Sequence, residues 1–417
     1  MSEFGRVLRL EARRTALLVA VPLLTAVGAA VAWVSLAPVA YWDNSVIALM
    51  NSVRLLGPLA AGLAAWTAVR ERRLDYLRDL TPRSPATGAF MDMLLLSGAA
   101  LIAYAAVSAV VVIGTFLRDE AGPLHLTGVL AGAAALVMHV VAGYLAGRLV
   151  PRLATVVVVV VATWLWSALR VPATSWVSLL PPAALNRVEL FTGLRVGVLL
   201  SQTLWSAGLT AAMILAYAWW TTRRHLLAAA LAAALALVVF ATLRLESTGG
   251  QAVGPVAIDS ACREWPITVC VHPALRDGLP ALMNAATPLA ARLNDTPGAF
   301  TKVEQRPDTS EATLVHGVAS IHLRDLEPGY EADAVRQIRN ELVDPGACSV
   351  PKPAAAQYRS LIDAWLVGAE PPAISDLRAA RAFGLWTEEQ RRGWLRVHYR
   401  DYHRCALNAR DFARPSP

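Results

Sequence analysis

Residues 93–116 read MLLLSGAALIAYAAVSAVVVIGTF and contain no charged side chain. A helix of about 20 apolar residues crosses the hydrocarbon core of a bilayer. Lipid offers the backbone no hydrogen-bond partner, so a spanning segment of this composition must be a helix, which satisfies its backbone internally. This stretch therefore predicts a transmembrane helix and indicates an integral membrane protein.

Six further apolar runs accompany this one along the amino-terminal half of the chain. Of 417 residues, 56% are hydrophobic and only 17% charged, whereas soluble domains average about a quarter charged residues. We expect seven spans, near Ala16–Leu36, Val46–Val69, Met93–Phe116, Leu124–Ala146, Leu153–Leu169, Val196–Trp219 and Leu226–Leu243. The expected fold is a polytopic α-helical membrane protein followed by a small α+β domain.

Arginine accumulates in alternate connections between these spans. Cytoplasmic loops of membrane proteins carry an excess of arginine and lysine. The arginine-rich segments are the amino terminus and the connections after spans two, four and six, with Arg6, Arg9, Arg13, Arg14, Arg70, Arg72, Arg73, Arg78, Arg83, Arg148, Arg152, Arg223 and Arg224. The connection after span five breaks the pattern with Arg170, Arg187 and Arg195. On balance we expect a cytoplasmic amino terminus, and seven crossings then place the carboxy-terminal domain outside a bacterial plasma membrane.

The four cysteines provide a separate indication of topology. Cys262, Cys270, Cys348 and Cys405 all lie in the carboxy-terminal domain. An even number of cysteines confined to an exported region is typical of disulfides. Of the three connectivities we favour Cys262–Cys270, which closes a short loop, and Cys348–Cys405, which would hold the last helix. The alternative is four free thiols in a cytoplasmic domain.

Residues 57–88 form the longest arginine-rich connection and read GPLAAGLAAWTAVRERRLDYLRDLTPRSPATG. Leu74, Leu77 and Leu80 recur every three residues, a spacing that gives a short helix one apolar stripe. Pro82 and Pro85 would end that helix before the third span. Such a helix can lie on the membrane surface or dock into a partner. The alternative is an ordinary basic loop.

This connection resembles the first cytoplasmic loop of ABC-2 type exporter permeases, in which a Glu-Arg-Arg segment is followed by spaced leucines and a Pro-x-Ser turn. The likeness extends from residue 1 to about 222 and includes residues 8–14, LRLEARR, and residues 176–182, WVSLLPP. It implies a coupling helix that contacts a separate ABC ATPase subunit, formed by Arg70, Glu71, Arg72, Arg73, Leu74, Leu77, Arg78, Leu80 and Pro82. Leu74 and Asp75 replace the glycine usual in the family, and a seventh span and an external domain follow its six.

The resemblance also implies a homodimer, or a heterodimer with a similar permease, embedded in lipid. The only lysines are Lys302 and Lys352, and neither is preceded by glycine. A Walker A motif requires Gly-Lys followed by Ser or Thr, so we expect ATP hydrolysis on a partner subunit. No His-Glu-x-x-His or Gly-x-Ser-x-Gly motif is present. We therefore expect a non-enzymatic chain without cofactor or metal, and the dispersed arginines do not suggest nucleic acid.

Few polar residues fall inside the expected spans, where they are unfavourable and are often functional. His139 and Gln202 are the candidates for a polar site within the membrane. For His139, the competing interpretation is a hydrogen-bonded packing residue. Arg54 and Asp92 lie nearer the membrane surfaces. Glycines at four-residue intervals in span four predict close helix packing within the chain.

We divide the chain into a six-span membrane domain (1–222), a seventh helix (223–245), a linker (246–260) and a disulfide-containing domain (261–417). In the last we expect strands at Ile267–Val271 and Thr313–Leu323. Helices are expected at Pro273–Leu293, interrupted by Pro280 and Pro288, and at Ala332–Val343, Gln357–Val367 and Thr387–Ala406. The alternative to an exporter subunit is a membrane-anchored receptor or assembly protein whose external domain binds a ligand or partner.

Overall fold

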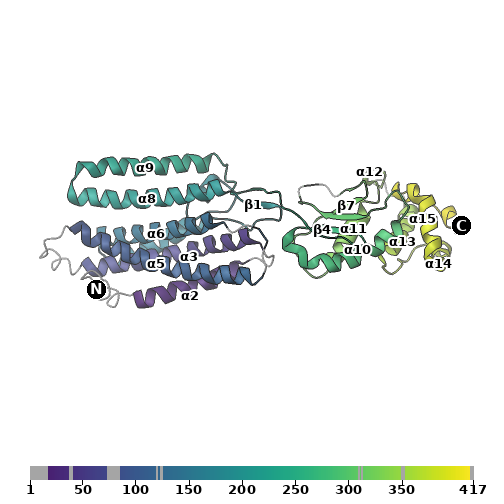
Figure 1. Ribbon diagram of the computed structural model, residues 1–417, viewed down its shortest axis with the longest axis horizontal. Helices are drawn as coiled ribbons and strands as arrows, with labels where there is room; N and C mark the ends of the chain where they lie inside the picture. Colours follow the sequence, from purple (N-terminus) through teal and green to yellow (C-terminus); the bar gives the residue numbers. More distant parts are fainter. Residues whose placement is uncertain are drawn as a thin grey trace. The chain divides into compact units, whose positions relative to one another are not determined.

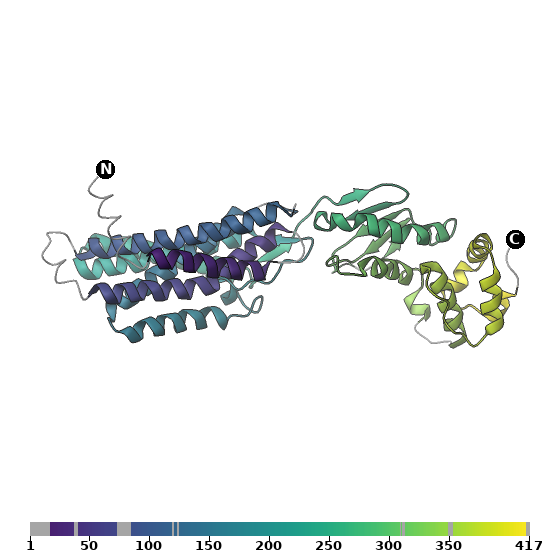
Figure 2. The ribbon, with the colours of Figure 1, turned by 90° about the horizontal axis from the view of Figure 1, so that it is seen from below.

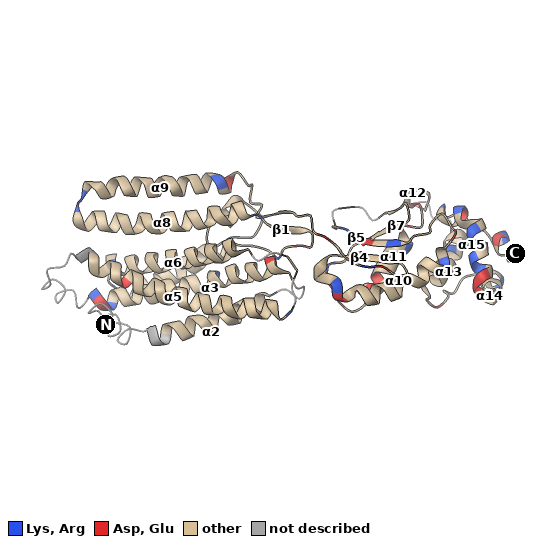
Figure 3. Cartoon of the chain, in the orientation of Figure 1, with Lys and Arg blue, Asp and Glu red and all other residues tan. Residues whose placement is uncertain are grey.

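The computed structural model describes residues 17–36, 41–72, 85–118, 121–122, 125–308, 310, 313–348 and 353–413. The chain forms two compact units, unit 1 (Met1–Val256) and unit 2 (Ala257–Pro417). Unit 1 is a bundle of long helices that run side by side, and unit 2 combines strands and shorter helices (Figure 1). Charged residues are sparse along the helices of unit 1 and frequent in unit 2 (Figure 3).

Unit 1 contains an apolar helix at each of the seven expected positions. They are α2 (Leu17–Ser35), α3 (Trp42–Arg72), α5 (Pro85–Phe116), α6 (Leu126–Leu149), α7 (Leu153–Ala168), α8 (Val196–Thr222) and α9 (His225–Glu246). Five of the described helices, α3, α5, α6, α8 and α9, are long and apolar enough to cross a membrane, whereas α2 and α7 are shorter. The chain is thus a multi-pass helical membrane protein.

Helix α3 lies at the centre of the bundle. It is the most buried of the five long helices, and α9 is the least buried. Its largest interface is with α6, and α9 packs mainly on α8. The helix begins at Trp42 and includes Asp43 in its first turn, four residues before the apolar run that predicted it. An acidic side chain there favours an earlier start because it interacts with the positive helix end.

The expected linker 246–260 is not wholly free of unit 1. Strand β2 (Val253–Pro255) pairs antiparallel with β1 (Thr192–Leu194), with Gly193 opposite Gly254. Glycine and polar composition suggested a connecting segment, but two short glycine-containing strands satisfy each other's backbone groups here. The boundary between the units therefore falls after Val256.

Unit 2 contains a five-stranded mixed sheet in the order β3-β4-β5-β7-β6. The strands are β3 (Ala261–Arg263), β4 (Thr268–Val271), β5 (Lys302–Gln305), β6 (Leu314–Val315) and β7 (Val318–Ile321). The central β4, β5 and β7 are parallel, and the edge strands are antiparallel to them. The expected strand Thr313–Leu323 is a hairpin, because His316 and Gly317 adopt positive φ and turn the chain.

Helices α10 (Leu279–Leu293) and α11 (Tyr330–Asn340) pack against each other and contact the sheet. The expected helix Pro273–Leu293 is interrupted at one of its two expected places: η2 (Pro273–Gly278) precedes α10, and Pro280 lies in the first turn of α10. Pro288 does not end the helix, because α10 continues through it to Leu293. The rest of unit 2 is helical, with α12 (Pro345–Cys348), α13 (Pro353–Val367), α14 (Leu377–Leu385), α15 (Glu388–His403) and η3 (Ala409–Phe412). This helical part is separate from the sheet in Figure 2.

Candidate functional site

The segment expected to contact an ATPase begins at the end of α3. Arg70, Glu71 and Arg72 form the last turn of this helix, and Arg70 stacks over Trp66 with 5.6 Å between the guanidinium carbon and the ring centre. The remaining expected contact residues, Arg73, Leu74, Leu77, Arg78, Leu80 and Pro82, lie outside the described residues. We call the end of unit 1 where α3 ends and α5 begins the loop end.

Polar side chains connect the end of α3 to three other helices. Arg72 donates to the backbone carbonyl of Arg148 at the end of α6. Arg148 Nε donates in turn to the hydroxyl of Tyr217 on α8, over 3.2 Å. Beside them, the Tyr144 hydroxyl on α6 donates to the buried carboxylate of Asp92 on α5, over 2.8 Å. The loop end is thus a polar network in which α3, α5, α6 and α8 all take part.

Small residues bring α3 and α6 into backbone contact just above this network. A Cβ atom at Gly143 would collide with the carbonyl of Ala61, and one at Gly147 with the carbonyl of Ala65. The contacts advance by four residues on both helices, so α3 and α6 run in the same direction. This is the small-xxx-small packing that brings helices close in membranes, and it is formed within the chain, as expected.

His139 and Gln202 are both buried, but no hydrogen bond joins these described residues. His139 Nδ1 lies 2.7 Å from the carbonyl oxygen of Ala135, one turn earlier in α6. Its ring faces Gly57 of α3, which makes it a packing residue. Gln202 has no partner for either amide atom among the described residues. It lines a cavity of about 10 Å³ beside Pro181, so its amide is the unsatisfied group of the pair.

The opposite end of the bundle holds the segment between α7 and α8. Two polar side chains at the start of α3 bind its backbone. Asp43 accepts from the N–H of Leu194 over 3.2 Å, and Asn44 accepts from the N–H of Val188 over 2.8 Å. Asp43 also lies 3.2 Å from Nε2 of His125. This segment, which includes residues 176–182, is therefore anchored to the central helix.

Arg170 is one of the three arginines that break the arginine pattern. Its side chain is only 8% exposed, and its Nε donates to the carbonyl of Trp166 over 2.7 Å. Its terminal nitrogens donate to the carbonyls of Leu180 and Pro182. The guanidinium organises the turn after α7, so local structure places this arginine and topology does not. The sequence does contain a signal for this role, which the sequence analysis did not use: Arg170 follows an apolar helix and precedes the pair Pro181-Pro182.

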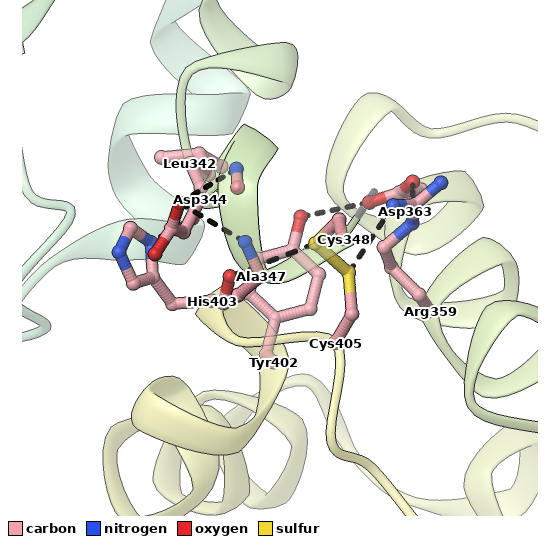
Figure 4. Close-up of a disulfide and its surroundings, with 10 residues drawn as sticks. Leu342, Asp344, Ala347, Cys348, Arg359, Asp363, Tyr402, His403 and Cys405 are labelled. Carbon is pink, nitrogen blue, oxygen red and sulfur yellow. Dashed lines mark hydrogen bonds and ion pairs between the residues drawn. A yellow bond between two sulfur atoms is a disulfide. The ribbon is translucent and has the colours of Figure 1, made fainter. Parts of the chain in front are cut away.

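The structure contains the disulfides Cys262–Cys270 and Cys348–Cys405, the connectivity that sequence spacing favoured. The first joins residues directly opposite each other on β3 and β4. The second ties the end of α12 to the residues after α15 (Figure 4). Disulfides are typical of proteins outside the cytoplasm, so unit 2 fits a non-cytoplasmic domain.

Asp363 is the centre of a buried polar cluster beside the second disulfide (Figure 4). Tyr402 donates to its Oδ1 over 2.7 Å, and Arg339 Nη1 lies 3.3 Å from its Oδ2. Burial raises the pKa of Asp363, against the opposing effects of Tyr402, Arg339 and Arg359. Arg359 also donates to Sγ of Cys405 over 3.3 Å. These contacts join α11, α13 and α15, and Arg339 Nε and Arg359 Nε lack a hydrogen-bond partner among the described residues.

A polar cavity of about 660 Å³ lies at the carboxyl end of β7. His322 directly follows this strand, and its backbone N–H donates to Gln337 of α11 over 2.7 Å. The charged lining residues are mostly acidic: Asp308, Arg324, Asp325, Glu327 and Asp333. Carboxyl ends of parallel strands are the usual binding edge of such sheets. Among the described residues, no group of three or more His, Cys, Asp or Glu side chains is arranged to hold a metal ion.

No protein-family model matches the chain, and searches of curated proteins and of solved structures find no similar protein. The likeness to ABC-2 type permeases is thus carried only by the residues that suggested it.

Proposed function

We propose that this chain is the permease subunit of an ATP-driven export system in a bacterial plasma membrane. It pairs with itself or with a similar permease, and two copies of a separate ABC ATPase subunit bind its cytoplasmic face. The chain crosses the membrane seven times, with the amino terminus inside and unit 2 outside. The single observation that carries this proposal is the polar network that joins the end of α3 to three other helices.

The network supports a coupling role because a displacement of the connection after α3 would be transmitted to other helices of the bundle. Arg72 reaches α6 through the Arg148 carbonyl, and Arg148 reaches α8 through Tyr217. The close packing of Gly143 and Gly147 makes α3 and α6 move as one body. Packed elements transmit small displacements because they resist deformation. ATP-driven movement of the segment from Arg70 to Pro82 would therefore tilt several helices together.

Two features support the topology. Apolar helices occupy all seven expected positions, although α7, with 16 residues, spans only about 24 Å. Both disulfides belong to unit 2 and no cysteine belongs to unit 1, as an odd number of crossings from a cytoplasmic amino terminus requires.

The coupling role is tested in the expected contact helix by introducing a charge at Leu77 and by reversing the charge of Arg78. We expect Leu77→Glu and Arg78→Glu to abolish recovery of an ABC ATPase with the detergent-solubilised permease, while the permease itself elutes as the wild type does. The matched control, Arg187→Glu, reverses a charge in the segment at the opposite end of the bundle and leaves ATPase recovery intact. Recovery of no ATPase with the wild-type chain, or equal recovery with all variants, rejects the coupling proposal.

The topology is tested separately with a membrane-impermeant maleimide on intact cells. All four cysteines lie in unit 2 and form disulfides. We therefore expect labelling only after treatment with a reductant, and we expect that labelling to occur in intact cells without permeabilisation. If labelling requires permeabilised cells, unit 2 lies in the cytoplasm and the number of membrane crossings is even.

The second candidate function is a membrane-anchored receptor or assembly protein, which the polar cavity at the carboxyl end of β7 favours. In that case unit 2 binds a ligand or partner and the bundle serves as its anchor. Replacing the bundle by an unrelated single-span anchor separates the two functions. A receptor keeps its function after this exchange, and an export permease loses it entirely.

A further inference from the structure

Arg54 and Arg170 bring two positive charges together where α7 ends. Arg54 Nη2 donates to the carbonyl of Ser167 over 2.5 Å and lies 3.5 Å from the carbonyl of Arg170. Arg170 carries the second positive charge at this turn, where its own guanidinium donates to the carbonyl of Trp166. Arg54 comes from the central helix α3, so two segments more than a hundred residues apart in sequence create this positive centre.

This positive centre lacks a counter-charge among the described residues. No carboxylate in the described part of the chain forms an ion pair with either arginine. The donors of Arg170 are directed at the carbonyls of Trp166, Leu180 and Pro182. Arg54 uses only Nη2, so three N–H groups on its Nε and Nη1 have no partner among the described residues. Carbonyls solvate a guanidinium but do not neutralise it, and unpaired charge in a low-dielectric region is strongly unfavourable.

The surroundings of this centre are typical of a membrane–water interface. Tryptophan concentrates at that depth because its ring is apolar and its N–H is polar. Trp164 and Trp166, in the last two turns of α7, are 47% and 41% exposed. The Arg170 guanidinium stacks on the Trp166 ring at 4.5 Å, and the Trp166 N–H donates to the carbonyl of Pro181 over 3.2 Å. Phosphate groups of lipids occupy this depth.

We propose that the free face of Arg54 binds a phosphate-type anion at the end of α7, in the positive field of Arg170. The anion offsets positive charge at this centre and accepts charge-assisted hydrogen bonds from unused N–H groups of Arg54. A phospholipid headgroup and a free phosphate both supply this chemistry. Binding also stabilises the turn after α7, because Arg54 simultaneously holds the carbonyl of Ser167. This site is independent of the coupling role proposed for the loop end.

The first experiment compares the purified full-length chain with Arg54→Gln in nanodiscs of phosphatidylcholine, with and without phosphatidylglycerol. We expect phosphatidylglycerol to be retained by the wild type in native mass spectra and to raise its melting temperature. In Arg54→Gln the apparent affinity falls about tenfold, the loss expected for hydrogen bonds to a charged group. Arg187→Gln removes an exposed charge from the segment after α7 and serves as the control that binds like the wild type.

A second arm separates the two sources of phosphate. If inorganic phosphate stabilises the wild type in phosphatidylcholine alone, and Arg54→Gln removes that effect, the site takes a free anion. If only phosphatidylglycerol acts, the site takes a lipid headgroup. Equal binding by the wild type, Arg54→Gln and Arg187→Gln, or no response of the wild type to either anion, overturns the proposal.

Arg54→Gln also removes the bond to Ser167, so a folding defect must be distinguished from a binding defect. Phenylglyoxal labelling of the wild-type chain, read at Arg54 by peptide mass spectrometry, needs no variant. We expect phosphatidylglycerol or phosphate to protect Arg54 while Arg187 remains reactive. Reactivity of Arg54 that is unchanged by both anions contradicts the site.

Discussion

Helix α8 of unit 1 and helix α15 of unit 2 begin in different ways. The N-cap of α8 is Arg195, which makes no side-chain cap, and the N-caps of α6, α7 and α9 make none either. The N-cap of α15 is Thr387, which forms a full capping box with Gln390. A helix in water competes with solvated chain, so a cap stabilises its start. Not every helix of unit 2 has one, because α10 and α11 begin at Gly278 and Gly329 without a side-chain cap. Within lipid the helix is the only permitted conformation, and a cap adds little.

The two units also gain stability from different contacts. In unit 1 the closest contacts are between backbones, at Gly143 and Gly147 of α6. In unit 2 an aromatic cluster around Phe383, Trp386 and Trp394 fills the helical part, and disulfides tie the ends of segments. The hydrophobic effect drives burial only where water is the alternative environment. In the bundle, close packing between helices therefore takes the place of the hydrophobic effect. Four experiments test this difference between the two units.

The largest effect is expected from removing the second disulfide. Cys348→Ser with Cys405→Ser opens a loop of 57 residues and should lower the free energy of unfolding of unit 2 by about 4 kcal/mol. Cys262→Ser with Cys270→Ser opens a separation of 8 residues and should lower it by about 2.5 kcal/mol. Pulse proteolysis in urea, followed at a carboxy-terminal tag on the full chain, measures both. Equal losses, or a bundle that becomes protease-sensitive, would contradict the assignment of these effects to unit 2 alone.

The second effect concerns backbone packing in unit 1. Gly143→Ala places a methyl group against the Ala61 carbonyl and should destabilise the bundle by about 2 kcal/mol through overpacking. Gly98→Ala, in α5, meets no atom within 4 Å and should be neutral or slightly stabilising because alanine favours helix. Thermal unfolding in detergent compares the two. A loss of stability in Gly98→Ala as large as that in Gly143→Ala would mean that close packing is not what stabilises unit 1.

The third experiment uses pH. Burial lowers the pKa of His272 to about 4, whereas in the unfolded chain it is about 6.5. As pH falls from about 6.5 to 4, the unfolded state binds the proton first, so the stability of unit 2 declines over this interval and is constant below it. His272 Nδ1 caps the N–H of Ala274, and His272→Asn keeps an acceptor there.

We therefore expect the urea midpoint of wild-type unit 2 to be lower at pH 5 than at pH 7, with a smaller difference in His272→Asn. An identical pH dependence in the two proteins would exclude His272 as its source.

The smallest effect is expected at the helix start of α15. Thr387→Ala removes the capping box and should cost about 1 kcal/mol, while Thr387→Ser should be close to neutral. The matched change in unit 1, Arg224→Ala at the uncapped start of α9, should leave thermal unfolding of the bundle unchanged. A loss in Arg224→Ala comparable to that in Thr387→Ala would remove the distinction between the two kinds of helix start.

Sequence patterns located every long helix of unit 1 but not how those helices interact. The apolar runs predicted their positions to within a few residues, except that α3 and α5 begin four and eight residues earlier than expected. In unit 2 the start of α15 at Thr387 was predicted, whereas β3, β5 and α14 were not. These elements are three to nine residues long, too short for periodicity to distinguish them from loops.

The sequence by itself determined that the chain is a membrane protein with an appended domain, because the bilayer demands long uncharged helices and this demand is local. The disulfide partners were favoured by spacing alone. Only the tertiary structure decided the roles of the polar residues: His139 packs against Gly57, Gln202 has no partner in the described part of the chain, and Arg170 organises the turn after α7. Each of these roles depends on groups from segments distant in sequence or on a turn that brings carbonyls together. Such convergence is a property of the folded chain and leaves no periodic pattern in the sequence.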